Sequence, residues 1–137
     1  MCGIAGLITS SPAGSVAVAA MLAVQAHRGP DGSGQWSSSD GRVHLGHRRL
    51  AILDLSERGA QPMRDASGRY VITFNGEIYN YRALRHDLEA RGCVFRSQSN
   101  TEVLLHLYAE HGEGMLAHLR GMYAFALWDA RRQSLLL

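Results

Sequence analysis

The sequence has few cysteines, little net charge and no long apolar run, and each shortage excludes a class of protein. Cys2 and Cys93 are the only cysteines among 137 residues, so the dense disulfide framework of a small secreted domain is not indicated and the cytoplasm is expected. A formal net charge of +2, from dispersed basic residues, implies neither nucleic acid nor a membrane as partner. The apolar stretch 15–26 is shorter than the roughly 20 residues that span a bilayer.

The remaining patterns predict one domain of the α+β class. A chain of 137 residues is long enough to bury a single core. Apolar runs bounded by turn residues predict strands at 3–9, 42–47, 49–54, 70–75, 122–129 and 134–137. Helical patterns lie at 15–26, 81–91 and 101–111, and the last two end at Gly92 and Gly112. Helices between strands, with hairpin-like neighbours elsewhere, favour a layered α+β fold.

The first predicted helix, residues 15–26, is rich in alanine. Ser15 is expected to cap it. Its larger apolar side chains are expected to be largely buried, namely Val16, Val18, Met21, Leu22 and Val24.

Cys2 is a candidate nucleophile because of its place at the start of the chain. Removal of Met1 would leave the α-amine of Cys2 beside its own thiol. An α-amine has a reference pKa of about 7.7–8.0, so near neutral pH it can accept the thiol proton without a catalytic histidine. The alternative is a small buried thiol, which Cys2 alone does not exclude.

Residues 74–80, with the sequence FNGEIYN, are the second candidate. Asn-Gly after an alternating strand is most often a tight hairpin turn. A helix rather than a returning strand follows here, so the Asn75 amide and the Gly76 N–H would be two donors at a strand end. Such a pair suits a developing oxyanion, and Glu77 beside it would be free to receive a cationic group of a substrate.

Histidines, arginines and a glycine-rich segment give weaker signals. Arg49 is either a solvated side chain or a bidentate partner of a carboxylate. His44 and His47, on a strand, would point to opposite faces and make a poor chelate, so no metal is predicted. The segment 28–34, RGPDGSG, lacks the spacing of a nucleotide-binding loop and is interpreted as a turn-rich loop.

Several short stretches are more specific together than any one alone. In chain order they read MCGIAG, HRGPDGSG, HRRLAILD, GAQPM, FNGEIYNYRALRHDL, SQSNTEV and GMYAFALWD. This series resembles the glutamine-hydrolysing domain of asparagine synthetases over nearly the whole chain, residues 2–137. The resemblance implies a class II glutamine amidotransferase of the N-terminal nucleophile hydrolase type, whose fold is a four-layer αββα sandwich.

The resemblance also implies roles for individual residues. Cys2 would attack the side-chain carboxamide of glutamine and release ammonia through a thioester, with Asn75 and Gly76 as the oxyanion hole. Glu77 would help bind the substrate α-ammonium, and Arg49 would hold the α-carboxylate. The substrate-binding set that it implies is Arg49, Leu50, Ile52, Asn75, Gly76, Glu77 and Asn100.

Asn100 departs from the pattern that this family usually shows. The family has Asp in an S-D-x-E-V stretch, where it helps hold the glutamine α-ammonium, whereas this chain reads SNTEV at 99–103. We expect the change to affect the strength of glutamine binding rather than the bond-breaking groups. The alternative role for Asn100 is a helix N-cap, which Asn fills as well as Asp.

Asparagine synthetases use the ammonia in a C-terminal domain that binds ATP and magnesium and activates aspartate. No such region is recognised in this sequence, and no cofactor is expected in the glutaminase domain itself. The apolar ending SLLL, without a turn or cap, predicts a truncated chain whose parent has at least one more domain.

The partners expected from the resemblance are glutamine and the synthetase domain of the parent chain, and a homodimer of the full-length enzyme is left open. Two alternatives for the function stay open as well. One is the glutaminase domain of another amidotransferase with a different ammonia acceptor. The other is a non-catalytic binding domain of the same fold, against which the presence of Cys2, Asn75 and Gly76 argues.

Overall fold

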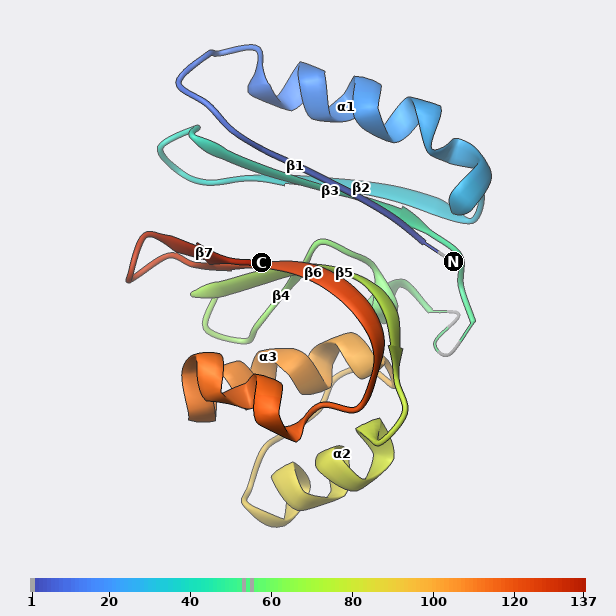
Figure 1. Cartoon of the computed structure of the whole chain (residues 1–137), viewed down its shortest axis with the longest axis vertical. Helices are drawn as coiled ribbons and strands as arrows, with labels where there is room; N and C mark the ends of the chain where they lie inside the picture. The colour runs from blue at the N-terminus through green and yellow to red at the C-terminus, as the bar shows by residue number, and fades with distance from the viewer. Residues whose placement is uncertain (1, 53, 55) are drawn as a thin grey trace.

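Four layers of secondary structure are stacked in the computed structural model, which describes residues 2–52, 54 and 56–137 (Figure 1). Helix α1 (Gly14–Val24) covers one face of a first sheet, sheet A. The other face of sheet A packs on a second sheet, sheet B. Helix α3 (Asn100–His111) lies on the outer side of sheet B, and helix α2 (Tyr81–Ala90) packs against α3. This order of layers confirms the predicted α+β class and the αββα sandwich.

Sheet A consists of β1 (Gly3–Ile8), β2 (Gly32–Ser37) and β3 (Val43–Arg49), with β3 in the centre. Both pairings are antiparallel, and Gly3 lies opposite Arg48. Because of this register, the start of β1 meets the end of β3. Cys2 is therefore brought beside Leu50, although 48 residues separate them in sequence.

Sheet B consists of β4 (Met63–Arg64), β5 (Tyr70–Ile78), β6 (Gly121–Asp129) and β7 (Ser134–Leu136) in that order, all antiparallel. β6 pairs with β5 over its full length, from Tyr70 to Ile78. β4 has only two residues and pairs only with Val71 and Ile72. Among residues 2–52, 54 and 56–137, no strand therefore pairs with this edge of β5 along its second half.

Each face of β5 contributes to a different core. Ile72 and Phe74 belong to the larger core between sheet B and the outer helices, with Leu104 and Leu107 of α3. Val71 points the other way, into a smaller core between the two sheets. A strand buried on both faces reads as a continuous apolar run, which explains the sequence YVITF at 70–74.

Helix α1 corrects part of the sequence-based prediction. It begins at Gly14, one residue before Ser15, and no side chain caps it. Only one face meets sheet A, so Val18 and Leu22 are buried, whereas Val16 and Val24 are 69% and 74% exposed. Met21, also predicted to be buried, is 38% exposed. None of the helices among the described residues has the length and apolar character needed to cross a bilayer.

Two predictions were wrong, one for the residues that follow β3 and one for the start of β2. Residues 50–52 and 54, predicted as part of a strand at 49–54, form a loop, and Leu53 lies outside the described residues. The segment 28–34, interpreted as a loop, begins at the last residue of a short 3₁₀ helix (Ala26–Arg28) and enters β2 at Gly32. Small residues mark a close approach of backbones here, since a Cβ on Gly34 would collide with the Gln61 carbonyl.

The other predicted elements are found with shifted ends. Helix α3 begins at Asn100, one residue before the predicted start, and Gly112, at a φ of +56°, ends it as expected. Helix α2 ends at Ala90, with Gly92 at a φ of +93°. Two more short 3₁₀ helices, Glu57–Gly59 and Gly112–His118, complete the described secondary structure.

Asp129, at the end of β6, is a buried carboxylate, with 1% of its surface exposed. It accepts hydrogen bonds from Arg69 Nε at 2.9 Å and Nη2 at 2.7 Å, and from the backbone N–H of Arg131 at 2.9 Å. The Arg69 guanidinium, followed by the backbone donors, lowers the pKa of Asp129 below its ordinary value of 3.8. The ionised form is therefore stabilised by the fold.

Replacing Asp129 with Asn should lower the free energy of unfolding by about 2 kcal/mol at pH 7, because charge-assisted hydrogen bonds are lost. Since the folded pKa is lowered, this contribution is complete above the unfolded value of 3.8 and is lost as the pH falls through the folded one. Urea unfolding of both proteins at pH 7 and pH 3 should show a smaller difference at pH 3. Glu110→Gln, which breaks an exposed pair with Arg91, is the control and should change stability little. An equal effect of Asp129→Asn at both pH values would contradict this account.

Candidate active site

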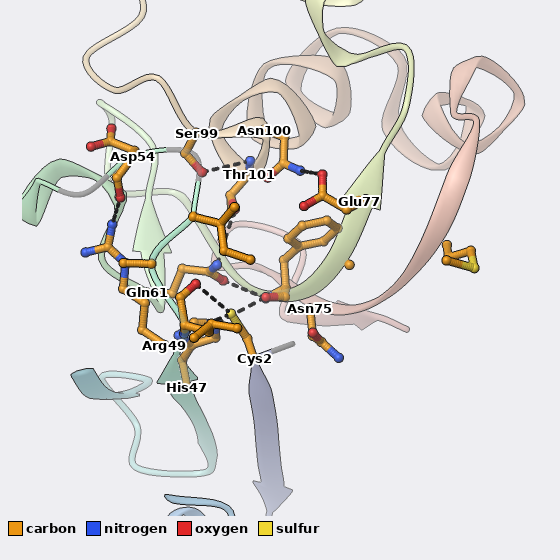
Figure 2. A pocket seen from close by; sticks show the side chains of 17 residues that line it. Cys2, His47, Arg49, Asp54, Gln61, Asn75, Glu77, Ser99, Asn100 and Thr101 are labelled. Atoms are coloured by element: carbon orange, nitrogen blue, oxygen red, sulfur yellow. Dashed lines mark hydrogen bonds between the residues drawn. The ribbon is translucent and has the colours of Figure 1, made fainter. Parts of the chain in front are cut away.

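A cavity of about 130 Å³ lies where the end of sheet A, the open edge of β5 and the start of α3 meet (Figure 2). Every residue that the sequence analysis assigned to the site lines this cavity, and they are Cys2, Arg49, Leu50, Ile52, Asn75, Gly76, Glu77 and Asn100. Figure 2 shows Cys2 and Asn75 at one end and Glu77 and Asn100 at the other. A molecule in the cavity could therefore contact a thiol and a carboxylate at once.

The thiol of Cys2 is held by the backbone that follows β3. Leu50 N–H donates a hydrogen bond to Cys2 Sγ at 3.4 Å. The Cys2 thiol in turn donates to the Leu50 carbonyl oxygen at 3.7 Å. Arg28 Nε donates to the Cys2 carbonyl at 3.1 Å. These contacts fix a half-buried sulfur at the cavity wall. The expected α-amine depends on loss of Met1, which lies outside the described residues.

The Asn75-Gly76 pair was predicted to lie in a hairpin turn or at a strand end. Both predictions are wrong, because strand β5 continues through the pair to Ile78. Gly76 has a φ of +152°, and a Cβ at this position would collide with the Met122 carbonyl of β6. Only glycine fits this close approach. The strand is therefore able to pass Gly76 without a break, and its backbone at that residue lines the cavity.

The alternation of an antiparallel ladder decides where the Gly76 N–H points. Phe74 N–H donates to Gln61 Oε1 at 2.6 Å, away from β6. Tyr79 N–H donates to the Arg120 carbonyl, at the start of β6, so the odd-numbered residues face β6. Because successive residues alternate, Gly76 directs its N–H to the open edge of β5. That edge is the cavity wall.

The Asn75 side chain lies on the face of β5 that turns toward sheet A. Thr73, two residues earlier on the same face, donates its hydroxyl to the Gly46 carbonyl of β3 at 3.0 Å. Asn75 is half-buried and lines the cavity. A side-chain amide and a backbone N–H from neighbouring residues thus border the same space, which is the arrangement that stabilises an oxyanion.

Glu77 and Asn100 form the polar end of the cavity. Asn100 Nδ2 lies 3.5 Å from Glu77 Oε2, and Asn100 is 5% exposed. The N-cap of α3 is Ser99, whose Oγ accepts from Thr101 N–H at 3.0 Å. Asn100 is therefore the first helical residue, and its alternative role as the cap is wrong. Its amide is left to face Glu77.

Arg49 holds the loop that follows β3. Its guanidinium donates to the Ser56 carbonyl at 2.9 Å and to the Asp54 carbonyl. Since a guanidinium has five N–H donors, others are left for a ligand. Hydrogen bonds from Ser56 and from Gln98 N–H lower the pKa of Asp54, so the loop carries an ionised carboxylate near Arg49.

Leu50 and Ile52, from the same loop, form the apolar part of the cavity wall. Leu50 is half-buried and supplies the peptide that holds the Cys2 thiol. Ile52 is 64% exposed and stands at the rim.

His47 is a cavity residue that sequence reasoning did not assign to the site. Its side chain is 1% exposed, and Nε2 lies 3.2 Å from the Phe74 carbonyl oxygen. Burial lowers the pKa of His47 to about 4, so the imidazole is neutral near pH 7. His44 points to the opposite face, where it bonds Ser37 Oγ at 2.7 Å, as the strand spacing predicted. Among residues 2–52, 54 and 56–137 no cluster of three metal-ligating side chains is formed.

Gln61 and Thr101 also line the cavity and were not predicted as site residues. Gln61 belongs to the GAQPM stretch, one of the motifs that carried the resemblance, but no local pattern relates it to Phe74 or to Thr101, 13 and 40 residues away. Only the fold brings these residues together.

Comparison with known proteins identifies the family. Residues 1–137 match the family described as "Glutamine amidotransferase domain". The chain is 42% identical over 134 residues to asparagine synthetase [glutamine-hydrolyzing] 1 of Bacillus subtilis, covering 94% of this chain and 21% of that protein. It is 44% identical over 111 residues to amidase chry2 of Gibberella zeae, covering 81% of this chain and 16% of that protein. The chain thus spans about a fifth of the length of the curated relatives that it matches.

The solved structure of glutamine phosphoribosylpyrophosphate amidotransferase from B. subtilis superposes with a TM-score of 0.74. That match covers 94% of this chain and 35% of the other, at 24% identity, so it supports the fold alone. The family match and the asparagine synthetase relatives confirm the resemblance found in the motifs. The chain belongs to the glutamine amidotransferase family.

Proposed function

We propose that this chain is the glutaminase part of a glutamine-dependent asparagine synthetase. It hydrolyses glutamine to glutamate and ammonia through a thioester on Cys2. The observation that carries the proposal is that the Cys2 thiol, Asn75 and Gly76 lie at one end of a cavity whose other end holds Glu77 and Asn100. This arrangement suits an amino acid whose side-chain amide is to be cleaved.

The reaction begins with attack of Cys2 Sγ on the carboxamide carbon of glutamine. The thiol proton passes to the α-amine of Cys2, which is free once Met1 is removed. The carbonyl oxygen becomes an oxyanion, which accepts hydrogen bonds from the Asn75 amide and the Gly76 N–H. The C–N bond then breaks, the nitrogen takes a proton from the ammonium of Cys2 and leaves as ammonia, and a thioester is formed. Water cleaves the thioester, releasing glutamate and restoring the thiol.

Charge orients the substrate in the cavity. Arg49 binds the α-carboxylate through donors that the Ser56 and Asp54 carbonyls do not use. Glu77 binds the α-ammonium, with Asn100 as a neutral partner. Leu50 and Ile52 pack against the aliphatic part of the glutamine side chain.

The rest of the parent protein uses the ammonia. The curated relatives extend well beyond the region that this chain matches, which is consistent with a synthetase domain that binds ATP and magnesium and amidates aspartate. The parent enzyme is expected in the cytoplasm, and a homodimer of it is left open. A different acceptor is the second candidate, because amidase chry2 is as similar to this chain as the asparagine synthetases are.

The role of Cys2 is tested by glutamine hydrolysis in a preparation whose N-terminus is known from mass spectrometry. Cys2→Ala should abolish ammonia release, because no other group in the cavity replaces the nucleophile. Cys93→Ala is the matched control and should leave activity largely intact, since Cys93 packs against the core and does not line the cavity. Full activity in protein that retains Met1 would refute the α-amine as base. A non-catalytic binding domain would release no ammonia in any form.

The oxyanion role of Asn75 predicts a loss in kcat. Asn75→Ala removes one preorganised donor and should lower kcat by about 10²–10³, with a smaller effect on KM. Asn75→Asp keeps the size of the side chain but puts an acceptor where a donor is needed, so it should be at least as slow. Steady-state kinetics with glutamine measures both. An unchanged kcat with a raised KM would mean that Asn75 binds substrate and does not stabilise the oxyanion.

Asn100 should limit the strength of glutamine binding. Asn100→Asp would add a charge-assisted hydrogen bond to the substrate ammonium and improve binding by about 1–2 kcal/mol, or roughly five- to thirtyfold in KM, with kcat little changed. Because the new carboxylate would lie beside Glu77, the ligand-free protein should also melt at a lower temperature. Gln98→Glu adds the same charge on an exposed neighbouring residue and is the control. A KM that is unchanged or higher in Asn100→Asp would place Asn100 outside the ammonium site.

A further inference from the structure

Strand β4 ends before it reaches the part of β5 that borders the cavity. Met63 lies opposite Ile72, so the register assigns Gln61 to the position opposite Phe74. The backbone does not continue the ladder there. The Gln61 carbonyl, which would face Phe74 in a continued ladder, lies against Gly34 of β2 instead. Phe74 is 3% exposed, and its edge N–H and carbonyl need other partners.

Two side chains supply these partners. The Gln61 carboxamide oxygen accepts from Phe74 N–H at 2.6 Å, and His47 Nε2 lies 3.2 Å from the Phe74 carbonyl oxygen. The two peptides that flank Phe74 are thus each held at this edge of β5 by a side chain. Two residues further along, Gly76 directs its N–H to the same edge, where no side chain of the described residues accepts from it.

The other end of the Gln61 carboxamide reaches helix α3. Gln61 Nε2 donates to Thr101 Oγ1 at 3.2 Å, and Thr101 is 1% exposed. Thr101 is the residue after Asn100 and lines the cavity. One side chain therefore connects the strand that carries Asn75 and Gly76 to the helix that carries Asn100, as the hydrogen bonds in Figure 2 show.

We propose that Gln61 is a positioning residue, whose carboxamide ends the β4–β5 ladder at Phe74 and thereby leaves Gly76 N–H open to the oxyanion. If β4 continued past Phe74 as a strand, its backbone would also pair with the Gly76 N–H. The same carboxamide fixes the spacing between the oxyanion end of the cavity and the helix start at the ammonium end. This inference deepens the proposed glutaminase function and rests on it for its catalytic consequence.

The test compares Gln61→Met with Gln98→Met in the whole chain. Both changes replace a carboxamide by a thioether of similar length. Gln98 is exposed and, among the described residues, no hydrogen bond of its side chain is found, so it controls for the chemical change. Gln61→Met should lower kcat by about tenfold to a hundredfold through misplaced donors, with KM changed much less. Alkylation of Cys2 by iodoacetamide, which needs no oxyanion hole, should keep its rate.

Amide hydrogen exchange, followed by NMR, supplies a readout that does not depend on glutamine turnover. In the unmodified chain the Phe74 N–H should be protected and the Gly76 N–H should exchange fast. Gln61→Met should remove the protection at Phe74, whereas Gln61→Glu, which keeps an acceptor, should retain it. Equal protection of Phe74 and Gly76 in the unmodified chain would overturn the proposal.

Other results of these experiments also test the role of Gln61. A folded Gln61→Met protein with unchanged kcat, even if it melts at a lower temperature, would reduce Gln61 to a structural residue. Should this variant fail to fold, Thr101→Val removes only the anchor of the carboxamide and should lower kcat by a smaller factor; no change would overturn the proposal. If the unmodified chain, shown to lack Met1, does not hydrolyse glutamine, the proposed function fails. Exchange at Phe74 and Gly76 still decides whether Gln61 ends the ladder.

Discussion

The site depends on a difference in length between two paired strands. β5 has nine residues and β4 has two, so one edge of β5 beyond Ile72 pairs with no strand in the part of the chain that the structure describes. An unpaired edge inside a protein is costly, because each buried N–H and carbonyl needs a partner. Here side chains satisfy Phe74, and the next edge donor, on Gly76, faces a cavity. The cavity lies where further β4–β5 hydrogen bonds would otherwise form.

Sheet A brings the reacting sulfur to that edge. The antiparallel register places the first residue of β1 beside the last residues of β3, so the Cys2 thiol meets the Leu50 peptide. Contacts between the sheets then set the depth at which the sulfur sits. Thr73 bonds Gly46, and His47 bonds Phe74, so β3 and β5 are joined at two successive residues of β5. The loop after β3 completes the wall, and Arg49 holds that loop.

The sequence predicted the layers and the cavity-lining residues better than it predicted their surroundings. Strong periodic segments such as β5 and α3 were recognised because both are packed on the main core. The strand at Gly32–Ser37 was missed because its small residues carry no apolar pattern; they allow the Gln61 backbone to approach, which only the fold reveals. The prediction that Val16 and Val24 are buried was wrong, because composition does not tell whether a helix is covered on one side or on two. Gln61 and His47 act through partners far away in sequence, and no spacing rule connects them.

The one-sided packing of α1 has a consequence for the behaviour of the isolated chain in solution. The helix contains no charged residue, and Val16 and Val24 are mostly exposed on its outer face. The sequence pI is about 8.8, so in mildly alkaline buffers the chain has almost no net charge to keep such faces apart. Self-association through the outer face of α1 is therefore least opposed in this pH range. Colloidal stability of the isolated domain is best sought well below its pI, at low protein concentration.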